Sequence, residues 1–229
     1  MEQEEINFSD FIASSTHDMK NSLSIQIGFL EELLNENRDK LAASTLDQLG
    51  HTIYEAKRMN TNLIQILSMY KLGKSIYPID IAEQSVNEVL EEMVLQNQSI
   101  MEFKGISVSV DCPEDCFWYF DRDLVSGILV NALNNAYNYT MDKIHIVAKL
   151  QDKMLEIRVE DNGQGYPASL LQGNIADNKG VSFSTGSTGL GFYFSSLVAG
   201  MHKNGSKQGC LAIENGGTYG GGCFVVTLP

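Results

Sequence analysis

The stretch NALNNAYNYT, residues 131–140, decides how the second half of the chain is interpreted. It continues the helical pattern of residues 122–130, so Asn131 and Asn135 lie four positions apart on one helix face. An amide oxygen is a hard, neutral ligand, suited to a Mg²⁺ ion that keeps several waters and bridges phosphates. When this stretch is considered by itself, a pair of ordinary surface asparagines remains an alternative.

A carboxylate follows at the end of a predicted strand. The segment DNGQGY begins with Asp161, and Gly163 and Gly165 come directly after it. A carboxylate fixed at a strand end can accept a hydrogen bond from an exocyclic amine, and glycines let a ring approach the backbone closely. A tight turn between strand and loop would use the same residues.

A third segment, STGLGF, places Gly189 and Gly191 immediately before a predicted helix. A helix start of this kind offers backbone N–H groups to phosphates. A lone glycine pair is weak support for a site. The three segments in this order, separated by a low-charge stretch, indicate a nucleotide-binding site.

The composition limits the partners. The chain has 229 residues, 43% of them hydrophobic, and a formal net charge of -13. This anionic surface disfavours nucleic acids and anionic membranes, and no apolar run reaches the roughly 20 residues that a membrane span needs. The acidic N-terminus is unlike a secretory signal. We therefore expect a cytoplasmic protein, or the cytoplasmic portion of a longer sensor, with reduced thiols at Cys112, Cys116, Cys210 and Cys223.

The first 73 residues contain almost no glycine or proline and predict two long helices. The first runs from about residue 7 to 35. The second carries a heptad seam: Leu46, Leu49, Ile53, Ala56, Asn60, Leu63, Leu67 and Tyr70. A hairpin of this kind usually pairs with a second copy to form a four-helix bundle, with Asn60 fixing its register. A hairpin that packs on its own C-terminal domain is the alternative.

The rest of the chain alternates between strand and helix patterns. An amphipathic helix is predicted over residues 82–105, and further helices over 122–140 and 189–202. Predicted strands cover 106–112, 143–151, 154–163, 209–215 and 222–229. This order favours an α/β sandwich with helices on one face of a mixed sheet, and with the hairpin an α+β chain.

At this point the chain resembles a known family. HDMKN at residues 17–21 is similar to the phospho-acceptor box of sensor histidine kinases, and the three segments above are similar to the N, G1 and G2 boxes of their GHKL-type (Bergerat) ATP-binding domain. The resemblance implies a dimerisation and phosphotransfer domain at 1–73, a linker at 74–80 and a catalytic ATP-binding domain at 81–229. The implied cofactors are ATP and Mg²⁺.

The resemblance also assigns roles within the ATP domain. Asn135 would hold Mg²⁺, and Asn131 would support the triphosphate. Tyr139 would lie against adenine, and Asp161 would accept a hydrogen bond from its amino group. Further nucleotide contacts are implied at Gly163, Gly165, Thr188, Gly189, Leu190 and Gly191.

His17 is the predicted phospho-acceptor. A neutral imidazole is nucleophilic at the nitrogen that lacks a proton. Asp18 can orient the ring and stabilise its proton, and Lys20 offers a cation to the incoming phosphoryl group. Asn21 lies one helical turn on, where it could position a water that attacks a phosphoaspartate on a partner.

Four departures from the family pattern bear on ATP binding and catalysis. Ser22 stands where a proline is usual, Asn138 where a basic residue is usual, and Ser187 where glycine is more common. The segment between Tyr166 and residue 186 is short. We expect Lys179, the only cation in that segment, to cover the phosphates in place of the missing charge.

The resemblance implies a two-component histidine kinase core that phosphorylates His17 from ATP. By the same resemblance, the phosphoryl group would pass to an aspartate of a response regulator, which would dock around Ile25–Leu33 and the facing part of the second helix. Phosphatase activity toward the regulator is a second expectation. The alternatives are a dimeric phosphotransfer or partner-binding protein with an inactive ATP domain, and a GHKL ATPase unrelated to signalling.

Overall fold

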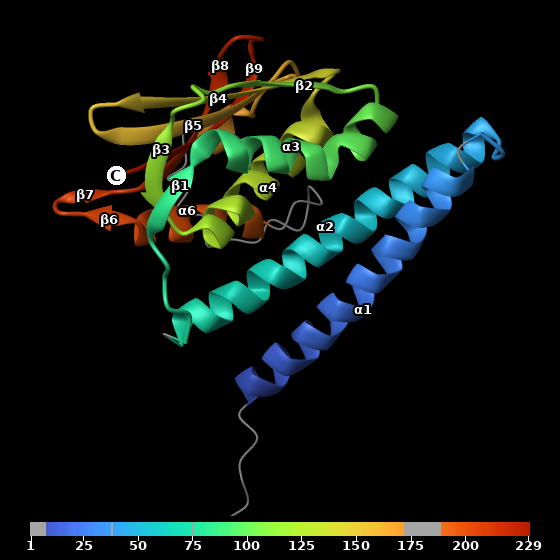
Figure 1. Ribbon diagram of the computed structural model, residues 1–229, viewed down its shortest axis with the longest axis horizontal. Helices are drawn as coiled ribbons and strands as arrows, with labels where there is room; N and C mark the ends of the chain where they lie inside the picture. The colour runs from blue at the N-terminus through green and yellow to red at the C-terminus, as the bar shows by residue number, and fades with distance from the viewer. Residues whose placement is uncertain (1–7, 38, 75, 172–188) are drawn as a thin grey trace, which may run out of the picture. The chain divides into compact units, whose positions relative to one another are not determined.

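The computed structural model describes residues 8–37, 39–74, 76–171 and 189–229 (Figure 1). The chain divides between Pro78 and Ile79 into two compact units. Each unit is described by itself. No helix in these described ranges is long and apolar enough to cross a membrane.

The N-terminal unit is a hairpin of two long helices, α1 (Phe8–Asn37) and α2 (Ala43–Gly73). The turn begins where the backbone N–H groups of Lys40 and Leu41 both donate to the carbonyl oxygen of Asn37. An ion pair of 2.7 Å between Lys57 Nζ and Glu31 Oε1 joins the two helices. The predicted pair of helices is confirmed.

The hairpin leaves many large apolar side chains exposed. Ile27 and Ile53 are buried, but nine large apolar side chains are exposed on the two helices. They are Phe11, Ile12, Met19, Ile25, Phe29, Leu33, Met59, Ile64 and Ile66. Extensive exposed apolar surface of this kind marks an interaction surface.

The C-terminal unit is built on a five-stranded sheet in the order β2-β4-β5-β9-β8. Its strands are β2 (Ser107–Asp111), β4 (Lys143–Gln151), β5 (Met154–Asp161), β8 (Cys210–Gly216) and β9 (Gly221–Leu228). β2 and β4 are parallel, and the other neighbours are antiparallel. The predicted mixed sheet is confirmed.

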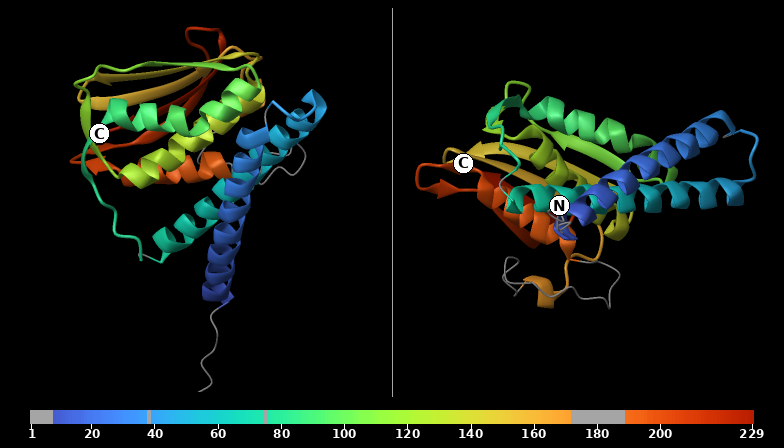
Figure 2. Two further views of the ribbon diagram at one scale, coloured as in Figure 1. Left: turned by 45° about the vertical axis from the view of Figure 1, so that its right-hand side comes forward. Right: turned by 90° about the horizontal axis from the view of Figure 1, so that it is seen from below.

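Three helices cover one face of this sheet: α3 (Val86–Phe103), α4 (Arg122–Tyr139) and α6 (Leu190–Met201), as Figures 1 and 2 show. Alternate strand residues such as Ile144, Ile146, Leu155 and Ile157 are buried, as the pleat of a strand packed on one side requires. This core fixes the ends of α4, β5 and α6, where the predicted nucleotide residues lie.

The helix predicted over residues 82–105 is wrong in its first turn. Residues Ala82–Ser85 form strand β1, which pairs antiparallel with β3 (Phe117–Phe120). The helix starts after Ser85, because the Ser85 Oγ accepts a hydrogen bond from Glu88 N at 3.4 Å and caps it. Pairing with an aromatic strand distant in sequence outweighs the local helical pattern.

Smaller elements complete the unit. The strands β6 (Lys203–Asn204) and β7 (Lys207–Gln208) form a short hairpin that the sequence pattern did not predict, and α5 (Ala168–Leu171) is a single turn. All four cysteines are free thiols.

Candidate functional site

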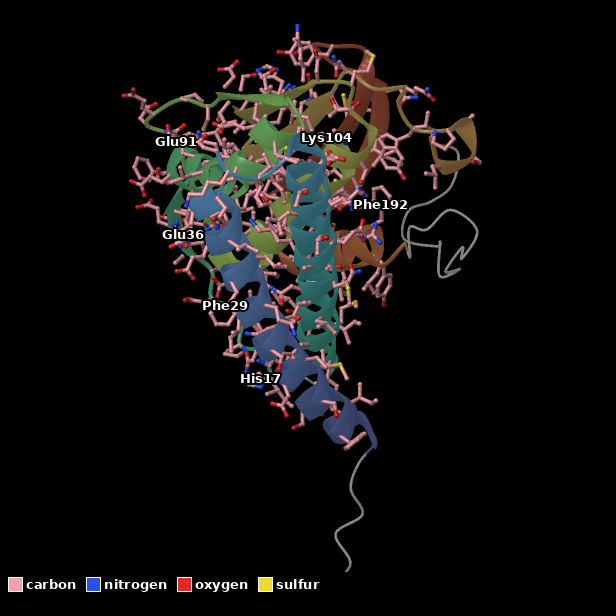
Figure 3. The ribbon with its side chains drawn as sticks, turned by 90° about the vertical axis from the view of Figure 1, so that its right-hand side faces the viewer. His17, Phe29, Glu36, Glu91, Lys104 and Phe192 are labelled. Atoms are coloured by element: carbon pink, nitrogen blue, oxygen red, sulfur yellow. The ribbon has the colours of Figure 1, made fainter. Side chains whose placement is uncertain are left out.

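His17 lies on the surface of α1, with 54% of its side chain exposed (Figure 3). Its Nδ1 is 3.4 Å from Asp18 Oδ1 and 3.4 Å from Asn21 Nδ2. The described residues make no hydrogen bond to Nε2. Asp18 Oδ1 can accept from Nδ1 when this nitrogen carries the proton, whereas the Asn21 amide nitrogen, a donor, can pair with Nδ1 only in the other tautomer. With the proton on Nδ1, the Nε2 lone pair is open to a reactant. Lys20 is half-buried two positions beyond Asp18.

An open groove of about 750 Å³ runs between the two helices next to this histidine. Its walls include Asp18, Ser22 and apolar side chains from both helices: Met19, Leu23, Met59 and Leu63. A groove with this lining can accept an apolar helix face from another molecule.

Asp161, at the end of β5, is the best-defined group in the α/β unit. The residue is only 6% exposed. Its Oδ1 accepts hydrogen bonds from the backbone N–H groups of Gly163 at 2.7 Å and Gly222 at 3.2 Å. No described residue donates to Oδ2. Oδ2 is not among the fully buried unpaired oxygens, and its partner oxygen is fixed by two backbone N–H groups. A carboxylate oxygen held in this way can accept a hydrogen bond from a ligand amine.

The glycines around Asp161 are required by close backbone approaches. A Cβ on Gly163 would lie 1.9 Å from the carbonyl oxygen of Tyr139, and one on Gly222 would lie 2.8 Å from Asp161 Oδ2. Gly165 has φ +74°, a conformation that favours glycine. The loop after β5 therefore packs directly on the end of α4.

The side chain of Asn215, in β8, holds the far end of this loop. Its Oδ1 accepts from Tyr166 N at 2.6 Å, and its Nδ2 donates to the Tyr166 carbonyl oxygen at 2.9 Å. The Tyr166 ring meets the edge of Phe192, which stacks on Phe224. Burial raises the pKa of the Tyr166 phenol well above its usual value, and the charge of Asp161 raises it further.

The two predicted N-box amides have different environments. Asn131 is buried, and its Nδ2 donates to the carbonyl oxygen of Gly191 and to Ser195 Oγ, both at 3.1 Å. It therefore ties α4 to the start of α6. Asn135 is half-buried, and its amide makes no hydrogen bond within the described part of the chain. Tyr139 is 55% exposed.

The start of α6 has the predicted form. Gly189 has φ +64° and precedes Leu190, the first helical residue. Gly191 fits against Asn131, because a Cβ there would be 3.1 Å from the Asn131 Oδ1. The predicted roles of Lys179 and Thr188 fall outside the described residues.

Asn162 and Asn215 were not identified from the sequence. The Oδ1 of Asn162 accepts from Thr140 Oγ1 at 2.7 Å and from the backbone N–H groups of Met141, Asp142 and Lys143, each at 3.1 Å. The Asn162 side chain thus connects the turn after α4 to the end of β5, directly after Asp161. The only sequence signal was its place inside the DNG triplet.

The other histidines have structural environments. His202 is buried, its Nδ1 donates to the Val198 carbonyl oxygen at 2.9 Å, and its Nε2 accepts from Asp121 N at 3.1 Å. His145 Nδ1 lies 3.2 Å from Thr218 Oγ1. His51 is exposed on α2.

Most of the α/β unit matches a known class of ATPase domain. Residues 120–229 match the family of histidine kinase-, DNA gyrase B-, and HSP90-like ATPases. The match covers 110 of the 229 residues and spans α4, β4, β5, α6, β8 and β9.

Over a longer stretch, the chain is similar to sensor histidine kinases. It is 27% identical to the sensor protein KdpD of Clostridium acetobutylicum over 96% of this chain and 24% of that protein. It is 26% identical to the virulence sensor histidine kinase PhoQ of Salmonella typhimurium over 67% of this chain and 31% of PhoQ. The chain therefore spans less than a third of the length of these two relatives.

Solved structures share the fold. The full-length histidine kinase ShkA, in complex with AMPPNP, aligns with a TM-score of 0.59 at 19% identity, over 96% of this chain and 45% of that one. The catalytic domain of the histidine kinase ThkA aligns with a TM-score of 0.56 over 65% of this chain and 95% of that domain. The resemblance to the catalytic core of sensor histidine kinases is thus confirmed.

Proposed function

We propose that this chain is a two-component histidine kinase core that binds ATP in its α/β unit and phosphorylates His17. The observation that carries the proposal is Asp161, whose Oδ1 is fixed by two backbone N–H groups while no described residue donates to its Oδ2, within the stretch 120–229 that matches the ATPase family. A 6-amino group of adenine is a matching donor. The AMPPNP bound to ShkA supports the same type of ligand.

The phosphate end of the nucleotide would lie toward α6, where backbone N–H groups at Gly189–Gly191 begin a helix. Asn135 would hold Mg²⁺ through its amide oxygen, which no described residue occupies. The bound ion supplies charge neutralisation on the phosphates.

In the proposed reaction, Nε2 of His17 attacks the γ-phosphorus of ATP. The bond from phosphorus to the β–γ bridging oxygen breaks, and ADP leaves. Asp18, 3.4 Å from Nδ1, stabilises the proton on that nitrogen as the ring gains positive charge. The phosphoryl group then passes from Nε2 to an aspartate carboxylate of a response-regulator receiver domain.

We also propose a dimer, with the groove and the exposed apolar side chains of the hairpin other than Ile25, Phe29 and Leu33 packed against a second copy. A four-helix bundle would cover this surface. Exposed residues of α1, among them Ile25, Phe29 and Leu33, would contribute to regulator docking.

The test is incubation with Mg²⁺ and γ-labelled ATP, followed by measurement of acid-labile, base-stable label. We expect label on the wild type and on His51→Ala, a matched exposed helix histidine, and none on His17→Ala. Label that persists in His17→Ala would refute the assignment. No label, with His17 still accepting phosphate from a phosphorylated regulator, would support the phosphotransfer alternative. ATP hydrolysis without label would support the unrelated ATPase.

The phosphatase proposal has its own test. Asn21, 3.4 Å from His17 Nδ1 through its amide nitrogen, would position a water for hydrolysis of the regulator's phosphoaspartate. Asn21→Ala should slow loss of label from a phosphorylated regulator. An unchanged rate would remove this role from Asn21.

A further inference from the structure

We propose that Asn215 is a positioning residue for the nucleotide base, acting by fixing the backbone of the loop that follows Asp161. The inference rests on the proposed function, because it needs a nucleotide bound at Asp161. It assigns base selectivity to a strand outside the three sequence segments that predicted the site.

The first support is the completeness of the Asn215 contact. One amide side chain satisfies both backbone groups of Tyr166, with its oxygen 2.6 Å from the N–H nitrogen and its nitrogen 2.9 Å from the carbonyl oxygen. Two such bonds fix the two peptide units on either side of the Tyr166 Cα, as a pair of ladder bonds to one residue does between antiparallel strands. The loop is thereby held to β8, although no strand pairing joins them.

The second support is that both ends of the loop depend on one pair of residues. Asn215 and Gly222 are direct partners in the β8–β9 register. Gly222 N donates to Asp161 Oδ1 at 3.2 Å, while Asn215 holds Tyr166. The segment 161–166 is therefore braced at its first and last residues from one position of the sheet.

The third support is the fit at Gly165. This residue has φ +74°, and a Cβ on it would lie 2.7 Å from Asn215 Oδ1. The amide thus occupies the space beside the glycine and limits the paths that the loop can take. Gly163, whose N–H is the shorter donor to Asp161 Oδ1, lies between these fixed points.

Loss of the Asn215 contact should weaken binding of the base and leave binding of the phosphates unchanged. If Tyr166 is released, the N–H of Gly163 shifts, and Asp161 Oδ2 no longer faces the 6-amino group at the right angle. The start of α6 has a separate anchor, because Asn131 Nδ2 donates to the carbonyl oxygen of Gly191 at 3.1 Å. Phosphate contacts there should survive.

The experiment compares the affinities of the full chain for Mg²⁺-ATP and Mg²⁺-inosine triphosphate, in which a carbonyl replaces the 6-amino group. We expect the wild type to prefer ATP. Asn215→Ala should weaken ATP binding by about tenfold, the size expected from the loss of one or two hydrogen bonds, and inosine triphosphate binding far less. The matched control is Asn97→Ala, which removes an amide-to-backbone bond of 2.8 Å in α3 and should leave both affinities unchanged.

Asn215→Asp is the second variant. It keeps an acceptor for Tyr166 N–H but faces the Tyr166 carbonyl with an oxygen, so the ATP preference should also fall. If Asn215→Ala does not fold, Asn215→Asp is the variant that tests the inference. Hydrogen exchange at the amides of 161–166 should quicken in both variants and stay unchanged in β4.

An equal loss of affinity for both nucleotides would make Asn215 merely structural and overturn the inference. The inference would also be overturned if the wild type binds ATP and the Asn215 variants keep the same preference for ATP over inosine triphosphate. A wild type that binds neither nucleotide would overturn the proposed function, and this inference with it.

Discussion

The hairpin and the α/β unit hold their candidate reactive groups in different ways. His17 is 54% exposed, and its polar partners among the described residues lie one and four positions away on its own helix. Asp161 is 6% exposed and is held by a backbone N–H from Gly222, in a different strand. One site is built from local sequence, and the other is built from the tertiary fold.

The difference predicts how each site responds to change. A helix-surface group can be replaced with little effect on stability, because its side chain packs against little. A group at the junction of α4, β5 and β9 shares its environment with backbone, so a substitution there affects folding and binding together. Glycine substitutions in each unit test this contrast most directly.

The largest effect is expected for Gly163→Ala. The new Cβ would lie 1.9 Å from the Tyr139 carbonyl oxygen, a backbone atom that cannot rotate away. We expect a loss of about 3 kcal/mol in the free energy of unfolding, measured by urea denaturation, and loss of ATP binding. A variant as stable as the wild type would show that the loop does not pack on the end of α4.

A smaller effect, confined to binding, is expected for Asp161→Asn. The change is nearly isosteric, and the retained oxygen can still accept from Gly163 N and Gly222 N. The amide nitrogen, a hydrogen-bond donor, then takes the place of Oδ2 and faces the 6-amino group of adenine, which is also a donor. ATP affinity should fall by about 10- to 100-fold, and the preference should shift toward inosine triphosphate, whose carbonyl accepts from the amide. Titration calorimetry measures both, and a retained ATP preference would contradict the assigned role.

The sequence predicted most of the fold because most elements carry their own pattern. The alternation of β4 and β5 and the periodicity of α4 are local signals. β1 was missed because AEQS has no strand pattern of its own. Its strand conformation depends on pairing with Phe117–Phe120, more than thirty residues later.

The candidate site follows the same rule. The two units' reactive groups could be named from short motifs, since each motif lies within one turn or strand end. Asn215 could not, because its contact with Tyr166 arises from the β8–β9 register and spans 49 residues. Residues that position a loop from another strand leave no local signal.

Acid should weaken the α/β unit through Glu160, next to Asp161. Burial opposes its charge, but the N–H of Thr218 at 2.7 Å and Arg158 Nε at 2.9 Å outweigh this and lower the pKa of the carboxyl below its usual 4.5. His145 Nδ1 also faces it, at 3.9 Å. A lowered pKa means that the stabilisation is present above pH 4.5 and is lost as the pH falls below that value.

The matched comparison is Glu160→Gln, which cannot titrate. Urea unfolding of both proteins between about pH 6 and 3 should show the wild type losing more stability than the variant. Parallel curves would mean that Glu160 has the same affinity for protons in the folded and unfolded chain.

The smallest effect, with the opposite sign, is expected for Gly28→Ala in α1. Nothing lies within 4 Å of a Cβ at this position, and the residue is exposed in a helix interior. Alanine should stabilise the helix by about 0.5–1 kcal/mol, because it loses less conformational freedom than glycine on folding. A glycine-to-alanine change should therefore be tolerated at Gly28, eleven residues from His17, although the same change at Gly163 disrupts the loop beside Asp161. The label on His17 should be unchanged in Gly28→Ala. If Gly28→Ala destabilises the protein, this face of α1 is closely packed in solution. The hairpin would then not be a region built from local sequence alone, and the contrast with the α/β unit would be wrong.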